Sequence, residues 1–359
     1  MVRILHTSDI HLEKILTKTS YSSKFSEERR SDLWETIERL LEYAKDNKVD
    51  LVLIAGDLYE NEYFGLNHVY KLFEIFKRYS PLEIVLLAGN HDRHLKDSVF
   101  NKLDIPNNLN LISSDSLDYV YYPTLNTRVY GIGWENDTYY NFQIDHFSLN
   151  CEFINILMLH ADLINKDHKY MYLEKEMISC LGFDYVALGH IHSYIELDTR
   201  IAYSGTPEPL DFGEEGAKGF LIVDIHGDQI SKQFIPFAKR TFESVKIKFN
   251  EYTTEEDVIK ALKKLKNKDN FYRIYLEGII SSELEYKLDY LIESTTYDFY
   301  YKEVINRLLI EMPNQEILQN PFTDAFIEYI KKSKLDQNSQ IKAINKGIKL
   351  IMGDYYVDN

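Results

Sequence analysis

Several short apolar runs in the first 192 residues of the chain end in an aspartate, an asparagine or a histidine. Apolar runs of this length predict buried strands, and each polar residue then lies directly at a strand terminus. Open α/β sheets bind their ligands at the carboxyl ends of strands, so the pattern predicts a sheet with a polar site along one edge. In chain order the motifs are Asp9-Ile10-His11, Gly56-Asp57, Gly89-Asn90-His91-Asp92, His160 and Gly189-His190-Ile191-His192.

The segments between these motifs alternate between strand-like and helix-like patterns. We expect strands over residues 2–6, 50–55 and 83–88, separated by amphipathic helices over 26–47 and 66–79. From about residue 107 the pattern becomes strand-rich, with expected strands over 119–122, 127–132, 154–160, 185–189, 200–204, 219–225 and 233–237. We therefore predict an α/β fold in which a β-sandwich of two packed sheets is flanked by helices.

A second alternation begins after Arg240 and has the size of a small separate domain. Expected strands over 244–249, 271–279 and 297–304 enclose expected helices over 254–265 and 282–292. Two more amphipathic helices are expected over 321–331 and 339–352, and each needs a surface to cover. We predict a catalytic domain over residues 1–240, a small α/β domain over 241–306 and a C-terminal helical region over 307–359.

The composition indicates a globular protein of a reducing compartment. The chain has 359 residues, of which 45% are hydrophobic and 27% charged, and these are ordinary values for a folded protein. Its two cysteines, Cys151 and Cys180, are too few for a disulfide framework, and we expect both in the core. No apolar run approaches the roughly 18 residues of a membrane helix, and the N-terminus leads directly into a strand. We expect a soluble cytoplasmic protein without membrane contact.

The net charge of −16 argues against a protein that coats nucleic acid by bulk electrostatics. Lys and Arg number 24 against 37 Asp and Glu through Arg240, a balance of −13, and 17 against 20 after it, a balance of −3. The acidity therefore belongs mostly to the first part, where two bound dications offset four charges close to the site. This charge weakens the binding of phosphodiesters without excluding it.

The side chains at the strand ends suit divalent metals. Carboxylates, an amide and imidazoles without cysteine favour manganese, iron or zinc in a site that is not structural. The ligands are too many for one ion, and Asp57 can bridge two metals that together promote an in-line displacement at phosphorus. We assign the first metal to Asp9, His11, Asp57 and His192, and the second to Asp57, Asn90, His160 and His190.

His91 and Asp92 complete the predicted site without binding a metal. His91 is expected to face the scissile phosphate, where it stabilises charge or protonates the leaving oxygen, and Asp92 is expected to orient its ring. His6 is expected to be a hydrogen-bonded core residue. The histidines expected on the surface are His68, His94, His146, His168 and His226. Weak candidates for base stacking are Tyr21, Tyr59, Tyr63, Tyr139 and Tyr140.

The strand-end motifs resemble those of the calcineurin-type metallophosphoesterases. That superfamily carries Asp-x-His, Gly-Asp, Gly-Asn-His, a later His and Gly-His-x-His in this order, and the resemblance covers about residues 2–205. Two stretches resemble the SbcD-type DNA repair nucleases more closely. They are residues 4–12 (ILHTSDIHL) and residues 203–215 (YSGTPEPLDFGEE), of which the second follows the last metal ligand.

The resemblance implies a DNA exonuclease and endonuclease that uses two manganese ions. It also implies a homodimer that works in DNA repair with an SbcC-type coiled-coil ATPase. Helices behind a small capping domain dock on the partner's coiled coil in that family, and residues 321–352 are the matching segment here. The helix expected over residues 66–79 is the candidate for the homodimer contact.

The chain departs from the family pattern, and other functions remain open. Some relatives carry a histidine three residues after the Gly-Asp aspartate, where this chain has Glu60, so a second functional histidine is not carried over. A small-molecule or cyclic-nucleotide phosphodiesterase needs the same ligands, and acidity is more natural in such an enzyme. A non-catalytic scaffold for the ATPase is the alternative of another class, and the complete ligand set argues against it.

Overall fold

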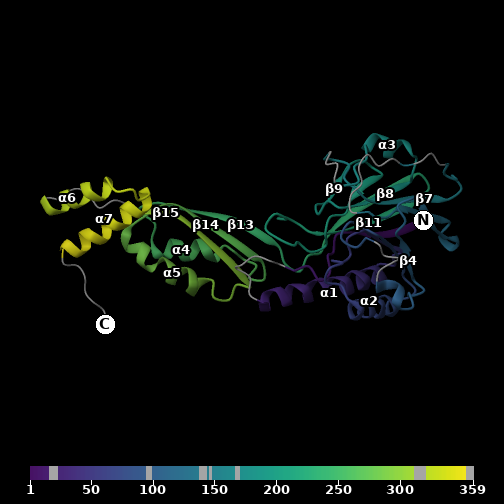
Figure 1. The fold of residues 1–359 in the computed structure, drawn as a ribbon, viewed down its shortest axis with the longest axis horizontal. Helices are drawn as coiled ribbons and strands as arrows, with labels where there is room; N and C mark the ends of the chain where they lie inside the picture. Colours follow the sequence, from purple (N-terminus) through teal and green to yellow (C-terminus); the bar gives the residue numbers. More distant parts are fainter. Residues whose placement is uncertain are drawn as a thin grey trace. The chain divides into compact units, whose positions relative to one another are not determined.

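The computed structural model describes residues 1–15, 23–93, 99–136, 144, 148–165, 170–310 and 321–352. The chain divides into two compact units, Met1–Thr241 and Phe242–Asn359. The first unit contains two six-stranded mixed sheets, and the second contains a three-stranded sheet and the C-terminal helices. Figure 1 shows helices lying along one side of the strands in each unit. The predicted fold class is confirmed.

The first sheet contains the N-terminal alternation of strands and helices. Its strand order is β12-β11-β1-β2-β3-β4, in which β1 to β4 are parallel and β11 and β12 antiparallel. Helices α1 and α2 pack on one face through an apolar cluster that includes Leu33, Ile37 and Leu72. The elements are β1 (Val2–Thr7), α1 (Ser23–Asp46), β2 (Leu51–Ala55), α2 (Leu66–Arg78), β3 (Glu83–Leu87), β4 (Leu109–Ile112), β11 (Gly219–His226) and β12 (Gln229–Pro236).

The second sheet packs against the other face of the first. Its order is β5-β6-β7-β8-β10-β9, and β6, β7, β8 and β10 are parallel. Ile4 and Leu53 of the first sheet meet Ile156 and Met158 of the second in a shared core, while Ile178 of α3 covers the outer face. The elements are β5 (Asp118–Tyr122), β6 (Thr127–Ile132), β7 (Ile154–His160), α3 (Lys175–Cys180), β8 (Tyr185–Gly189), β9 (Ile195–Glu196) and β10 (Ile201–Tyr203).

The sandwich brings the ligand-bearing strand ends of both sheets together. A Cβ on Gly189 at the end of β8 would lie 1.9 Å from the carbonyl oxygen of Ala55 at the end of β2. Only glycine permits so close an approach of two backbones. The first glycine of the Gly-His-x-His motif is therefore what lets a ligand strand of the second sheet contact one of the first.

The second unit is a smaller layer of parallel strands and helices. Its sheet has the order β13-β14-β15, with α4 and α5 packed on one face through residues such as Ile274, Val258 and Leu288. The side chain of Thr254 caps α4 and that of Ser281 caps α5, as each accepts a backbone N–H of the first turn. The elements are β13 (Phe242–Phe249), α4 (Glu255–Lys263), β14 (Phe271–Ile280), α5 (Ser282–Thr295), β15 (Tyr301–Ile310), α6 (Pro321–Lys331) and α7 (Gln337–Met352).

Some elements differ from the sequence-based expectations. β4, β9 and α3 were not predicted, because runs of four, two and six residues are too short to show a period. The strand expected over 297–304 begins only at Tyr301, after a turn, and continues to Ile310, so the boundary predicted at residue 306 falls inside it. Among the helices of the described ranges, none is long and apolar enough to cross a membrane.

The prediction that both cysteines lie in the core is wrong. Cys151 is exposed in the turn before β7, and Cys180 is exposed at the last residue of α3. Only one side of the short helix α3 faces the sheet, and Ile178 occupies that side, which leaves Cys180 exposed to solvent. His6 is buried as predicted, where the hydroxyl of Tyr185 and the carbonyl of Leu188 contact its two ring nitrogens.

Candidate metal centre

The loops after β1, β2 and β8 hold predicted ligands in a strained backbone conformation. Asp9, His11, Asp57 and His190 have φ values of 53°, 52°, 53° and 96°, a range that costs energy for any residue with a Cβ. The loops after β1 and β2 are joined by hydrogen bonds from the Asp9 amide to the Gly56 carbonyl (3.1 Å) and from the His11 amide to the Asp57 carbonyl (3.0 Å). Such strain is kept at functional sites when the surrounding contacts enforce it, and it marks these loops as the candidate site.

Asp9, His11 and His192 form a first group of converging ligand atoms, all within 4.8 Å of one another. The Nε2 atoms of His11 and His192 are 3.3 Å apart. Their Nδ1 atoms point elsewhere, to Glu60 at 2.9 Å for His11 and to Glu214 at 2.5 Å for His192. A carboxylate only accepts hydrogen bonds, so each Nδ1 carries a proton, and each ring in its neutral state offers the lone pair of Nε2 to the group. A cation between the two rings satisfies both lone pairs.

Asp57, Asn90 and His160 form a second group next to the first. The Nε2 atom of His160 lies 3.2 Å from Asp57 Oδ2 and 3.0 Å from Asn90 Oδ1, while its Nδ1 donates to a backbone carbonyl of β2. Asp57 Oδ2 also lies 3.7 Å from His11 Nε2, so one carboxylate faces both groups. The ring of His190 lies beside them, with its centroid 5.4 Å from that of His160. The seven predicted ligands therefore belong to these groups or lie directly beside them.

The carboxylates of the centre hold protons on the neighbouring imidazoles. Burial disfavours ionisation of Asp57, but the neighbouring imidazoles hold its pKa well below the usual range. Burial also disfavours protonation of His160 and His192, yet the charge of Asp57 on His160 and the hydrogen bond to Glu214 on His192 raise both pKa values to about 9. Protons thus lie where metal ions would bind, and metal binding would release them.

The pKa of His190 is shifted in the opposite direction to those of His160 and His192. Burial and the charge of His160 lower the pKa of His190 to about 4, so its ring is neutral at pH 7 and can act as a ligand. Its amide donates to both oxygens of Asp9, at 3.2 and 3.1 Å. The strained backbone of His190 therefore orients one ligand carboxylate while its ring faces the second group.

The family model for calcineurin-like phosphoesterase matches residues 2–194. That span is more than half of the 359 residues and contains the whole series of strand-end motifs. The chain belongs to the calcineurin-like phosphoesterase family. One similar solved structure is TT1561 of Thermus thermophilus, with 14% identity, a TM-score of 0.41 and coverage of 65% of this chain and 98% of that one. Another is a dimetal phosphatase from Danio rerio, with 11% identity, a TM-score of 0.38 and coverage of 65% and 95%.

The donor set of this calcineurin-like phosphoesterase fits two divalent metals. Carboxylate, amide and imidazole donors converge from both sheets, and no cysteine belongs to the groups. When bound, two metals supply neutralisation of phosphate charge and an activated water. The protein holds the carboxylates ready, since the Ser8 hydroxyl donates to Asp9 at 2.6 Å and the His91 amide donates to Asp57 at 2.8 Å. Manganese as the metal remains a prediction.

The predicted role of Asp92 is wrong. Its buried carboxylate does not orient the His91 ring but accepts hydrogen bonds from the backbone amides of Gly89 (2.6 Å), Leu58 (2.6 Å) and Asp57 (3.2 Å). Asp92 therefore joins the loop after β3 to the loop after β2. Aspartate side chains commonly accept hydrogen bonds from backbone amides of their own turn, and sequence spacing alone does not show when they do so.

Two glutamates that support the site were missed. Glu60 contacts the His91 ring at 2.9 Å, which is the position given to Asp92 by prediction, and it also contacts His11. Glu214 contacts His192 and also accepts the Leu210 amide at 2.9 Å. A signal for each was present in the sequence, because Glu60 is the position at which the chain departs from the expected motif pattern and Glu214 lies in the distinctive segment 203–215.

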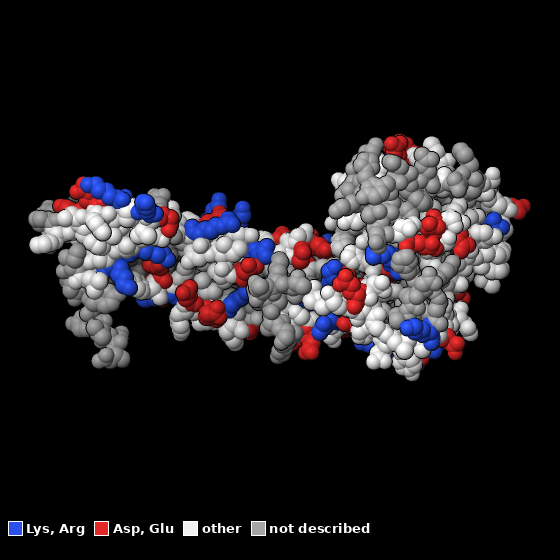
Figure 2. Space-filling view, viewed as in Figure 1, with Lys and Arg blue, Asp and Glu red and all other residues white. Residues whose placement is uncertain are grey.

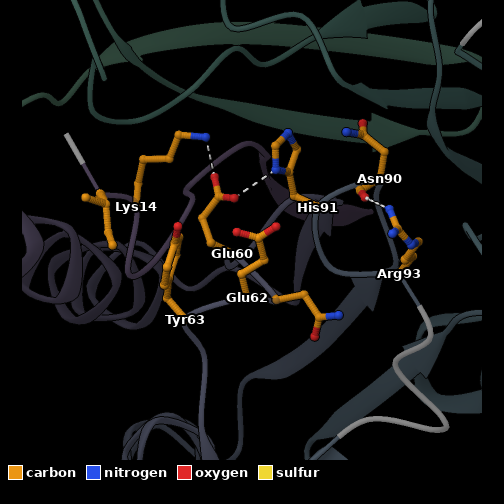
Figure 3. A pocket seen from close by; sticks show the side chains of 9 residues that line it. Lys14, Glu60, Glu62, Tyr63, Asn90, His91 and Arg93 are labelled. Atoms are coloured by element: carbon orange, nitrogen blue, oxygen red, sulfur yellow. Dashed lines mark hydrogen bonds and ion pairs between the residues drawn. The ribbon is translucent and has the colours of Figure 1, made fainter. Parts of the chain in front are cut away.

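A cavity of about 520 Å³ opens beside the centre. Figure 3 shows side chains from three loops around it, with Glu60 between Lys14 and His91. Tyr63 lines this cavity, whereas Tyr59 is fully buried and stacks on Phe64, so it offers no surface to a base. Tyr21, Tyr139, Tyr140, His94, His146 and His168 lie outside the described residues. The cavity gives a substrate direct access to His91 and Asn90.

Proposed function

We propose that this calcineurin-like phosphoesterase is a DNA nuclease subunit of the SbcD type. It hydrolyses phosphodiester bonds as an exonuclease and endonuclease, uses two manganese ions and acts in DNA repair with an SbcC-type coiled-coil ATPase. The segment over residues 203–215 carries the proposal, because its sequence resembles those nucleases and its residues support the metal centre. Without that segment, the metal ligands suit many phosphoesterases equally well.

The contacts of this segment explain why its sequence matters for the site. Glu214 near its end holds the ligand His192. Glu208 in its middle is fully buried and lies 3.5 Å from the guanidinium of Arg29 on α1, which also donates to the Pro209 carbonyl. The segment is thus fixed to a helix at one point and to a metal ligand at another, so it serves the site and is more than a connecting hairpin.

The C-terminal helices are the proposed contact with the ATPase. α6 packs on α7 through Ile327, Ile344 and Ile348, but Phe322 and Tyr329 of α6 remain 79% and 74% exposed. Neither ring belongs to the apolar cluster between the two helices, and substitution of both by glutamate is expected to abolish co-purification with a co-expressed SbcC-type ATPase. A truncation needs to retain Ile310, because β15 extends to that residue. Unchanged co-purification of the double variant contradicts this part of the proposal.

The proposed homodimer uses α2. Val69, Leu72 and Phe73 of this helix are buried, whereas Leu66 and Tyr70 are 44% and 59% exposed. Exposed apolar side chains beside a buried face suit a contact between two copies. Sedimentation analysis is expected to show a dimer for the wild type and a monomer for Tyr70→Glu, and a monomeric wild type rejects the contact.

A small-molecule or cyclic-nucleotide phosphodiesterase is the second candidate. The net charge of −16 favours it, because such an enzyme has no need to attract a polyanion. On the face shown in Figure 2, acidic and basic side chains of the described residues are interspersed and form no continuous basic surface. A DNA nuclease of this charge therefore depends on its metals and its partner for much of its affinity for DNA.

The test measures the activity of the wild type and two variants on three substrates. Wild type is incubated with Mn²⁺ and end-labelled linear duplex DNA, bis(p-nitrophenyl) phosphate or a cyclic nucleotide. Asp57→Ala removes the carboxylate that faces both metal groups, and Asp228→Ala removes an exposed carboxylate in the β11–β12 turn as the control. The proposal requires DNA degradation that is lost in Asp57→Ala and retained in Asp228→Ala. Hydrolysis of the small diesters alone, also in the presence of the ATPase, assigns the phosphodiesterase function in its place.

A further inference from the structure

One carboxylate connects the first metal group with the histidine of the cavity. Oε1 of Glu60 contacts His11 Nδ1 at 2.9 Å and Lys14 Nζ at 2.5 Å, and its Oε2 contacts His91 Nδ1 at 2.9 Å. We propose that Glu60 is a positioning residue that fixes His11 for metal binding and His91 for the substrate at the same time. The inference rests on the phosphoesterase part of the proposed function and does not depend on DNA as the substrate.

The contacts of Glu60 decide which nitrogen of each ring is available. Because a carboxylate cannot donate, the Nδ1 atoms of His11 and His91 must carry the hydrogen atoms of these contacts. For His11, this leaves Nε2 directed at His192, 3.3 Å away. For His91, Figure 3 shows the second ring nitrogen on the side away from Glu60. Glu60 therefore presents Nε2 of one ring to a metal and Nε2 of the other to a substrate.

Glu60 is itself held firmly enough to orient two rings. It is 8% exposed, its amide donates to the Leu12 carbonyl at 3.0 Å, and its own carbonyl accepts the Tyr63 amide at 3.0 Å. The rings of His11 and His91 also meet edge to face, with centroids 4.8 Å apart. Among the described residues, Glu60 is the carboxylate that contacts the Nδ1 atoms of both rings. A rotation of Glu60 would therefore disturb both histidines together.

A histidine at this position could not make the same arrangement. An imidazole has two ring nitrogens, and only one of them accepts when the ring is neutral. A glutamate has two oxygens, each able to accept more than one hydrogen bond, so it can serve two rings and the Lys14 ammonium. Glu60 can therefore hold the histidine of the cavity and His11 at the same time.

The test uses Glu60→Gln, which keeps the size of the side chain but leaves only one acceptor oxygen. In either orientation of the amide, one ring faces its NH2 group and loses its partner, and the other ring keeps a neutral acceptor in place of a charged one. We expect Mn²⁺ affinity, measured by calorimetry, to fall by about tenfold to a hundredfold. At saturating Mn²⁺ we expect kcat for bis(p-nitrophenyl) phosphate to fall by at least about tenfold with KM nearly unchanged.

A double variant distinguishes positioning from general destabilisation. If Glu60 acts on turnover through His91, Glu60→Gln adds little to the loss in kcat already caused by His91→Asn at saturating Mn²⁺. Glu13→Gln is the matched control, because Glu13 is a mostly buried carboxylate in the loop after β1 that lies 3.7 Å from the ring of His68. Glu13→Gln is expected to bind Mn²⁺ and to turn over as wild type does.

Two outcomes overturn the inference. One is a Glu60→Gln variant with wild-type Mn²⁺ affinity and wild-type kcat, and the other is a full, additive loss of kcat in the His91→Asn background. If the variant does not fold, the ¹⁵N spectrum of the wild-type imidazoles decides, because the inference requires protonated Nδ1 atoms in His11 and His91. A wild type that hydrolyses no diester refutes the proposed function, while the Mn²⁺ titration still tests the hold of Glu60 on His11.

Discussion

Substitution of Gly89 by alanine is the sharpest test of how the metal centre is built. A Cβ on Gly89 would lie 2.3 Å from Asp57 Oδ1 and 2.5 Å from the Asp57 amide nitrogen. Ordinary contacts of a Cβ begin at 3.4 Å, so the carboxylate of Asp57 has to move by about 1 Å. Asp57 Oδ1 also accepts the His91 amide at 2.8 Å, and the same displacement breaks that hydrogen bond.

The expected loss follows from this displacement. Asp57 faces both metal groups, so a shift of its carboxylate is expected to weaken the binding of both metals. A misplacement of about 1 Å can cost about a hundredfold in rate. We expect Mn²⁺ affinity of Gly89→Ala to fall by about tenfold to a hundredfold, measured by calorimetry. Hydrolysis of bis(p-nitrophenyl) phosphate is expected to fall by at least about a hundredfold. Overpacking of the buried turn is expected to reduce the free energy of unfolding by about 1–3 kcal/mol.

Gly65→Ala is the control for the loss of a glycine as such. Gly65 precedes α2, and a Cβ there has no heavy atom within 4 Å. Its metal affinity and turnover are expected to equal those of the wild type. If Gly89→Ala also binds Mn²⁺ and hydrolyses the diester as the wild type does, the close packing of Gly89 on Asp57 is not what fixes the bridging carboxylate.

Three further predictions concern the support of the site and the core. Glu214→Gln is expected to lower Mn²⁺ affinity by about tenfold to a hundredfold, because Glu214 orients a ligand histidine. Glu215→Gln, at the exposed neighbouring residue, is the control and is expected to bind Mn²⁺ as the wild type does. Arg29→Met is expected to lower the free energy of unfolding by about 3–5 kcal/mol in urea, because the buried Glu208 carboxylate loses the guanidinium 3.5 Å away and keeps Arg39, 3.8 Å away, as a cation. Glu208→Gln added to it is expected to restore part of the loss, since it removes that buried charge. Burial lowers the pKa of His6 to about 3, so its contribution to stability is fully present above its unfolded pKa of 6.5 and is lost as pH falls toward 3, by about 1.4 kcal/mol per pH unit. In the presence of a metal chelator, the free energy of unfolding of His6→Gln is expected to depend less on pH between 6.5 and 4.5 than that of the wild type.

The sequence by itself determined the architecture of the first unit and the types of residue at its site. Each apolar run that predicts a strand is a local pattern, and the residue that follows it is necessarily near the strand terminus. Parallel strands of one sheet place these termini on one edge, so Asp9, Asp57 and Asn90 were predicted to meet before any distance was known. The buried, hydrogen-bonded state of His6 followed from the same pattern, since it lies inside the first apolar run.

Tertiary structure alone decided which side chain supports which ring. Asp92 is adjacent to His91 in sequence, but its short side chain reaches the backbone amides of its own and the neighbouring turn. Glu60 lies 31 residues before His91, and its longer side chain reaches both that ring and His11 across the join of two loops. Such contacts depend on the relative placement of strands from different parts of the chain, to within about an ångström. Local periodicity carries no information at that precision, because it reports which face of a strand is buried and not what lies opposite its end.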